Sequence, residues 1–153
     1  MPSGDDLAQL FGALLAHEVR VAPARTLAGA PQLLAVYEGD EDAVAAVWCF
    51  DHALANHLAS ALTLIRPTLA RRLSSARAIP EAVAAVLCDI ATAAARVMDA
   101  PGRPSLRFKA LLLPAAPVPP SVGVLVKSRA RCADFDVILG GYGGGRLRIA
   151  LPA

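Results

Sequence analysis

The chain has 153 residues, a formal net charge of +2 and an apolar content of 56%, which suits one domain whose core needs neither disulfides nor metal. The small charge, the scattered basic residues and the few aromatic side chains argue against nucleic-acid binding. No apolar run reaches the roughly 18 to 20 residues that a membrane span requires, and the first ten residues carry acids where a secretory signal would carry Lys or Arg. We therefore expect a cytoplasmic protein that binds neither nucleic acid nor membrane.

The N-terminal segment predicts an amphipathic helix. Ser3 followed by Asp6 resembles a capping box. Five apolar residues then repeat at helical spacing, which are Leu7, Leu10, Phe11, Leu14 and Leu15. His17, near the predicted end of the helix, suits the negative end of its dipole.

Three β-like segments follow. Residues 19–22 and 33–38 are short runs typical of strands. Residues 38–42 form a polar turn, and residues 43–50 (AVAAVWCF) have so little polarity that they predict a central strand buried on both faces. The segments on either side of the polar turn should therefore pair as a hairpin.

A second helix is predicted directly after the central strand. Asp51 can cap it, and its apolar stripe comprises Leu54, Leu58, Leu62 and Ile65. Arg66 and Pro67 mark its expected end, because the residue before a proline disfavours helix. Residues 68–79 predict a short helix and a connection.

Residues 80–99 (PEAVAAVLCDIATAAARVMD) predict a long Ala-rich helix. Pro80 and Glu81 suit a first helical turn, and one face is apolar, comprising Val83, Val86, Leu87, Ile90, Ala94 and Val97. The polar residues are spaced by three, four and three and form one row, comprising Asp89, Thr92, Arg96 and Asp99. An acid three residues before a hydroxyl is a candidate site. The alternative, which these residues alone favour, is the solvated side of a core helix.

The C-terminal third predicts strands. Residues 106–112 alternate as in a half-buried strand, and four prolines then impose an extended crossover, which are Pro114, Pro117, Pro119 and Pro120. Residues 122–126 begin another strand, and the strands 135–139 and 146–151 bracket the glycine-rich segment 140–145 (GGYGGG). We interpret this segment as a hairpin connection. A phosphate-binding loop is excluded, because no Lys and Ser or Thr follow and the next segment alternates like a strand.

The cysteines and histidines do not suggest a metal site. Cys49, Cys88 and Cys132 are odd in number and widely spaced, which favours buried free thiols over a disulfide framework or a zinc site. His52 and His57 would lie about 140° apart around a helix, so they do not converge on one ion. We expect no metal and no cofactor.

The order of helix, hairpin, helix, long helix and terminal strands predicts an α+β sandwich, with a mostly antiparallel sheet and about three helices. This order resembles the CheX/CheC family of chemotaxis phosphatases, and more closely its single-site CheX-like branch. The resemblance covers almost the whole chain and implies a single CheX-like domain over residues 1–153. It rests on topology and hydrophobic pattern, with residues 43–50, the long helix and the strand that runs into Pro114 as its main correspondences.

The motif of the family is a Glu followed three residues later by an Asn on the long helix, often with an Asp or Ser four residues before the Glu. By position, Asp89 and Thr92 stand where the Glu and Asn would be, and Ala85 stands at the upstream polar position. In the family, the acid and the amide position water for attack on the aspartyl phosphate of a receiver domain. Asp89 is one methylene shorter than Glu, and Thr92 lacks the amide.

Two functions follow from this resemblance. The first is a non-catalytic CheX-like module that binds a signalling protein, such as a response-regulator receiver domain, or self-associates as a homodimer through its sheet edges. The terminal strands have few prolines after Pro120, which suits edge pairing, and the resemblance implies the same arrangement. The alternative is a weak or altered phosphatase of a response regulator, with Asp89 as water acceptor and Thr92 as orienting hydroxyl.

Overall fold

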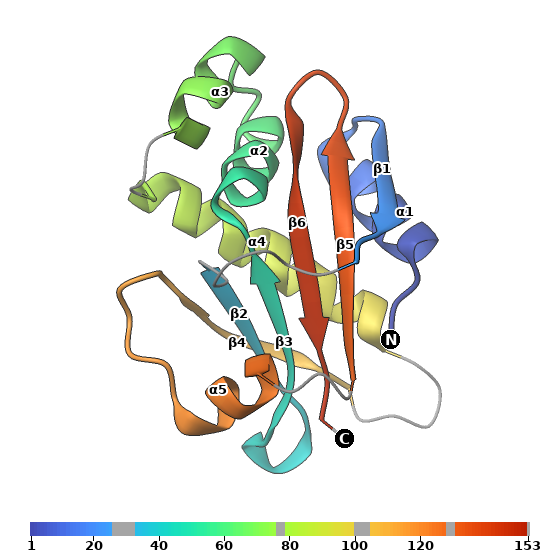
Figure 1. Ribbon diagram of the computed structural model, residues 1–153, viewed down its shortest axis with the longest axis vertical. Coiled ribbons are helices and arrows are strands. Elements are labelled where there is room, and N and C mark those ends of the chain that lie inside the picture. Colours follow the sequence, from blue (N-terminus) through green and yellow to red (C-terminus); the bar gives the residue numbers. More distant parts are fainter. Residues whose placement is uncertain (26–32, 76–78, 100–104, 128–130, 153) are drawn as a thin grey trace.

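The structure consists of one six-stranded sheet with helices on both of its faces (Figure 1). This computed structural model describes residues 1–25, 33–75, 79–99, 105–127 and 131–152, without the side chains of 73–75. Its helices are α1 (Gly4–Leu15), α2 (His52–Leu62), α3 (Pro67–Ser75), α4 (Glu81–Met98) and α5 (Pro120–Lys127). Its strands are β1 (Val19–Pro23), β2 (Leu33–Glu38), β3 (Val44–Phe50), β4 (Arg107–Leu112), β5 (Cys132–Leu139) and β6 (Gly143–Ala150), and a short 3₁₀ turn, Asp40–Asp42, joins β2 to β3.

The strand order is β1-β5-β6-β3-β2-β4, and all five pairings are antiparallel. The predicted α+β class and the β2–β3 hairpin are therefore confirmed. The expectation that the terminal strands provide a free edge is wrong. β1 pairs along β5, with Val19 opposite Leu139, and β6 lies between β5 and β3, so the edges of the sheet are β1 and β4.

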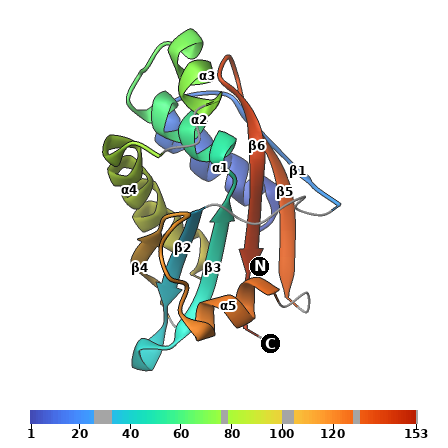
Figure 2. The ribbon, with the colours of Figure 1, turned by 60° about the vertical axis from the view of Figure 1, so that its left-hand side comes forward.

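The main core lies between the sheet and the helices α1, α2 and α4 (Figure 2). Helix α1 begins at the predicted capping box, in which the Ser3 side chain accepts from the Asp6 backbone N–H and the Asp6 side chain accepts from the Ser3 backbone N–H. The largest side chains with less than 2% exposure are those of Trp48, Tyr37, Phe11 and Phe50. Among the described residues, no helix has the length and apolar character needed to cross a bilayer.

The second face of the sheet carries α5, which packs on β2 and β3. Val122 and Leu125 bury their side chains in a small apolar cluster with residues of these two strands, namely Leu34, Val36, Val47 and Cys49. The strand predicted at residues 122–126 is therefore wrong. Pro120 at the first helical position favours a helix, and burial of one face, Val122 and Leu125, outweighs the β-preference of the valines.

Two further boundaries differ from the sequence prediction. Helix α2 ends at Leu62 and not at Arg66, because Leu64 adopts a left-handed φ of 56°, which a right-handed helix cannot accommodate. Residues 67–75 form α3, so the short helix predicted after residue 68 is confirmed, while residues 76–78 of the predicted connection lie outside the described residues. With α5, the described helices are five, where the sequence predicted about three.

The predicted β5–β6 hairpin is confirmed, but strand β6 begins inside the glycine-rich segment. Gly143 opposes Leu139 and has a φ of +132°, a conformation that favours glycine. A Cβ at this position would lie 2.8 Å from Cε1 of His57. The glycines thus let β6 approach α2 closely, which a connection alone would not require.

Candidate functional site

The polar row predicted on the long helix lies on the exposed side of α4. Asp89, Thr92, Arg96 and Asp99 are all exposed, while the predicted apolar face turns inward, with Val83, Leu87, Ile90 and Ala94 buried. The four polar side chains follow one stripe because they are spaced three or four residues apart. The structure therefore presents Asp89 and Thr92 to solvent on the same face.

A buried hydrogen bond ties the middle of α4 to the sheet. The hydroxyl of Tyr37, on β2, donates to the Ala91 carbonyl at 2.9 Å. Burial raises the pKa of Tyr37, so this hydroxyl stays protonated and keeps its role as donor. Because Ala91 lies between Asp89 and Thr92 in the chain, this bond helps to fix the part of α4 that carries them.

We expect Tyr37→Phe to lower the free energy of unfolding by about 0.5–1.5 kcal/mol, because it removes the buried hydrogen bond from the Tyr37 hydroxyl to the Ala91 carbonyl. Urea denaturation measures this change. Tyr142→Phe is the matched control, since the Tyr142 hydroxyl donates at 2.8 Å to the Ile65 carbonyl, away from α4. Only Tyr37→Phe should speed amide exchange in the middle of α4, and equal exchange in the two variants would contradict this role for Tyr37.

The hydroxyl of Thr92 is engaged with its own helix. Its Oγ1 donates to the Cys88 carbonyl one turn earlier, at 2.8 Å. The carboxylate of Asp89 makes no hydrogen bond or ion pair with any residue that the structure describes. Burial raises the pKa of the neighbouring Cys88 thiol, and the negative charge of Asp89 adds to this effect. Asp89 is thus an available hydrogen-bond acceptor, whereas the Thr92 hydroxyl already uses its hydrogen in a bond to the helix backbone.

Three other positions along α4 have surroundings that differ from those of Asp89 and Thr92. They are Ala85, at the upstream position of the family motif, and Arg96 and Asp99, the C-terminal half of the row. Ala85 is exposed, so this position offers a methyl group and no polar atom. Arg96 and Asp99 line a groove between α1 and the C-terminal half of α4, which Asp89 and Thr92 do not. The structure therefore divides the predicted row into an open surface and the wall of a groove.

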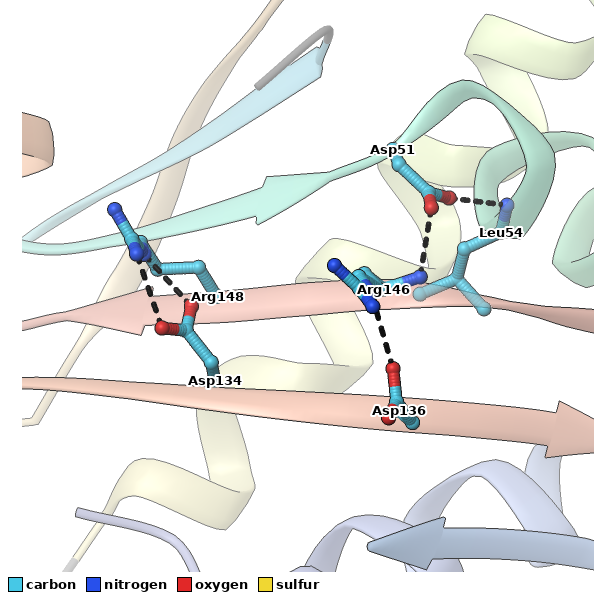
Figure 3. A network of polar contacts seen from close by, with 6 residues as sticks. All are labelled: Asp51, Leu54, Asp134, Asp136, Arg146 and Arg148. Atoms are coloured by element: carbon cyan, nitrogen blue, oxygen red, sulfur yellow. Dashed lines mark hydrogen bonds and ion pairs between the residues drawn. The ribbon is translucent and has the colours of Figure 1, made fainter. Parts of the chain in front are cut away.

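A second polar network joins β3, α2, β5 and β6 (Figure 3). Asp51 accepts hydrogen bonds from the backbone N–H groups of Leu54 at 2.7 Å and Arg146 at 2.9 Å. The sequence predicts the first of these, as a helix cap, but not the second. The Arg146 side chain donates in turn to Asp136 at 3.1 Å.

The neighbouring pair in Figure 3 is a bidentate one, in which Arg148 donates to both carboxylate oxygens of Asp134 at 2.7 and 3.0 Å. Both arginines and both aspartates lie on the sheet face opposite the main core, on adjacent strands. These two pairs were not predicted from the sequence. The available signal was the i, i+2 spacing of Asp134 with Asp136 and of Arg146 with Arg148 in two strands that form a hairpin.

Within the described ranges, no group of three His, Cys, Asp or Glu side chains could hold a metal ion. Of the three cysteines, Cys49 is buried, whereas Cys88 and Cys132 are only partly buried, so the expectation of buried thiols is wrong for these two. Burial raises the pKa of Cys49 to about 12.

His57 contacts the Gly144 carbonyl through Nδ1 at 3.2 Å, and burial lowers the pKa of its imidazole.

No protein-family model and no curated protein matches the sequence. The solved structures that resemble the fold include the following three, each of which covers 97% of this chain. A chain of the FliM–SpeE complex from H. pylori is 11% identical, with a TM-score of 0.70 and 81% of that chain covered. A chain of the FliG–FliM complex from H. pylori is 12% identical, with a TM-score of 0.67 and 86% covered.

The third is a chain of the CheX–CheY–BeF3–Mg complex from Borrelia burgdorferi, which is 14% identical, with a TM-score of 0.55 and 94% of that chain covered. The chain has a CheX-like fold. This confirms the resemblance and the fold class predicted from the sequence. At these identities the likeness concerns the CheX-like fold alone, so the function has to be argued from the side chains of α4.

Proposed function

We propose that this chain, as a single domain of residues 1–153, is a CheX-like module that binds a signalling protein without catalysis. The proposed partner is a response-regulator receiver domain, and the proposed contact is the exposed row on α4 around Asp89 and Thr92. No cofactor is required for such binding. The proposal places the protein in two-component signalling, in the cytoplasm.

The similar structures support a role in protein binding. Each of the three is a complex, of FliM with SpeE, of FliG with FliM, and of CheX with CheY. A fold found in three such assemblies is suited to presenting a surface to other proteins. The partners in those complexes do not identify the partner of this chain.

The observation that carries the proposal is the hydrogen bond from Thr92 to the Cys88 carbonyl. Positioning a water for in-line attack requires a donor and an acceptor held in fixed directions. The Thr92 hydroxyl already donates its hydrogen bond to the Cys88 carbonyl. The Asp89 carboxylate is exposed, and no described residue bonds to it and holds it in one orientation. An exposed carboxylate beside a hydroxyl remains suitable for recognition of a basic or polar surface.

The alternative is an altered phosphatase that hydrolyses the aspartyl phosphate of a response regulator. One observation favours it, which is that Asp89 is solvent-exposed and lies three residues before the hydroxyl of Thr92. An Asp89 carboxylate that accepts a proton from water could act without the amide of the family motif.

Asp89→Arg tests the binding role. We expect it to weaken binding of beryllofluoride-activated receiver domains from the same genome about tenfold or more, because it reverses a charge at the centre of the contact. Isothermal titration calorimetry measures this loss. Asp40→Arg, the same change on the exposed turn between β2 and β3, is the control and should bind as the native chain does.

Phosphate release from the same receiver domains, measured in separate mixtures without beryllofluoride, separates the two functions. With receiver domains charged by acetyl phosphate, the binding module leaves the rate of release unchanged. Accelerated release that disappears in Asp89→Ala and in Thr92→Ala would establish the phosphatase and refute the non-catalytic module. Self-association, through edge strand β1 or β4, would instead appear as a concentration-dependent elution volume of the protein alone.

A further inference from the structure

A groove of about 870 Å³ lies between α1 and the C-terminal half of α4. Its volume falls within the range of roughly 300–1,000 Å³ that is typical of sites for small molecules. Residues from α1, from α4 and from the chain after β6 line it. Neither Asp89 nor Thr92 lies in this groove, so it is separate from the surface proposed for the protein partner.

The floor of the groove is apolar. Leu10, Leu14, Leu106 and Leu151 pack against the main core and yet remain partly exposed where they line the groove. Space between the two helices arises because small side chains face it, including Ala13 on α1 and Ala93 on α4. An apolar body can therefore lie along these leucines and be removed from water, which is the main source of affinity in such sites.

The acids at the groove already have hydrogen-bond partners. The Asp6 carboxylate accepts from the N–H and the hydroxyl of Ser3, at 2.8 and 2.7 Å, and these bonds lower the pKa of Asp6. The Asp99 carboxylate accepts from the Leu106 N–H at 3.2 Å and from the Ser105 hydroxyl at 3.3 Å. Both acids thus serve to cap and connect local structure.

The cations at the groove have more free donors. Arg131 donates to the Pro152 carbonyl at 3.2 Å. Arg96, which is exposed, makes no hydrogen bond or ion pair with any residue that the structure describes. A guanidinium above an apolar floor is suited to a carboxylate or sulfonate, with which it forms strong, charge-assisted hydrogen bonds.

We propose that this groove binds a free anionic amphiphile, a molecule with one apolar chain or ring system and one carboxylate or sulfonate. The anionic group lies at Arg96 and the apolar body lies along the leucines between α1 and α4. Charge complementarity carries this assignment, since the groove combines an apolar floor with an arginine that has no described partner.

The single tryptophan gives a direct readout of binding. Its indole N–H donates to the sulfur of Met98 at 3.0 Å, and Met98 lines the groove. Titration with laurate, kept below its micelle-forming concentration, should shift the one indole resonance of Trp48 in a saturable manner. Dodecylamine, which has the same chain length and the opposite charge, should shift it much less.

Two variants locate the site. Arg96→Gln should raise the Kd for laurate about tenfold, and Ala13→Leu should raise it by a similar factor by filling the groove. Arg71→Gln on α3 and Ala82→Leu at the start of α4 make the same changes at exposed positions outside the groove, and they should leave the Kd unchanged. Thermal melts without laurate verify that all four variants fold.

The proposal is overturned if laurate and dodecylamine bind equally, or if Arg96→Gln and Ala13→Leu bind laurate as the native chain does. It is also overturned if phosphatidylglycerol vesicles bind the protein while free laurate does not, which would indicate a membrane surface in place of a free amphiphile. None of these results depends on Asp89→Arg, so the groove and the protein-binding surface are tested independently.

Discussion

Gly145→Ala is expected to lower the free energy of unfolding by about 3 kcal/mol. Gly145 lies on β6 opposite Val137, facing the first turn of α2. A Cβ there would lie 2.5 Å from the backbone nitrogen of Leu54 and 2.6 Å from Oδ1 of Asp51. Backbone atoms of a capped helix cannot move aside cheaply, so α2 and β6 must separate.

Urea denaturation of Gly145→Ala measures this loss. The matched control is Gly123→Ala on α5, where the nearest atom to an added Cβ lies 4.0 Å away. There the same change should stabilise the protein by about 0.5–1 kcal/mol, because alanine favours helix over glycine. A midpoint for Gly145→Ala that equals that of the native chain would contradict the close approach of α2 and β6.

Asp51→Ala is expected to lower the free energy of unfolding by about 2–4 kcal/mol. The change removes the cap of α2, worth about 0.5–2 kcal/mol, and leaves the N–H of Arg146 without its charged acceptor, worth about 1.5–2 kcal/mol, in the lower part of the usual range for such bonds. Both bonds are shown in Figure 3. One carboxylate thus connects the end of β3, the start of α2 and the strand β6.

Two control variants separate the contributions to stability of the two hydrogen bonds that Asp51 accepts. Ser3→Ala removes an exposed cap on α1 and should cost about 1 kcal/mol. Asp51→Asn keeps one acceptor oxygen for the Leu54 N–H and loses the second, so it should fall between Asp51→Ala and the native chain. Equal stability of Asp51→Ala and Ser3→Ala would show that the bond to Arg146 contributes nothing.

The sequence predicted the elements whose pattern and packing agree. Helix α1 followed from a capping box and a single apolar stripe, and β2 has the same bounds as predicted, residues 33–38. The long helix α4 also followed from one apolar face. In each case the local preference and the tertiary burial point in the same direction, so local rules suffice.

The prediction was wrong where tertiary contacts oppose local preference. The valines of residues 122–126 favour a strand, yet burial of Val122 and Leu125 over β2 and β3 selects helix α5. Strand order was not accessible either, since the pairing of β1 with β5 joins segments more than a hundred residues apart. The edge strands therefore could not be named from the sequence.

The candidate site shows the same division. Spacing alone placed Asp89 and Thr92 in one row along the long helix, whereas the exposure of that row is a finding of the structure. The bond from Thr92 to the Cys88 carbonyl is a choice of rotamer that spacing does not determine. The groove was not predictable, because its arginine on α4 and its leucines on α1 meet only when the two helices pack together.

The most direct test of the central claim maps where a partner contacts the protein. Amide resonances of the isotope-labelled chain are followed while a beryllofluoride-activated receiver domain is added. The proposed function predicts shifts that concentrate on the exposed stripe of α4, at Ala85, Asp89 and Thr92, and that vanish in Asp89→Arg. Shifts confined to the outer face of β5 and β6, or binding that Asp89→Arg leaves intact, would contradict it.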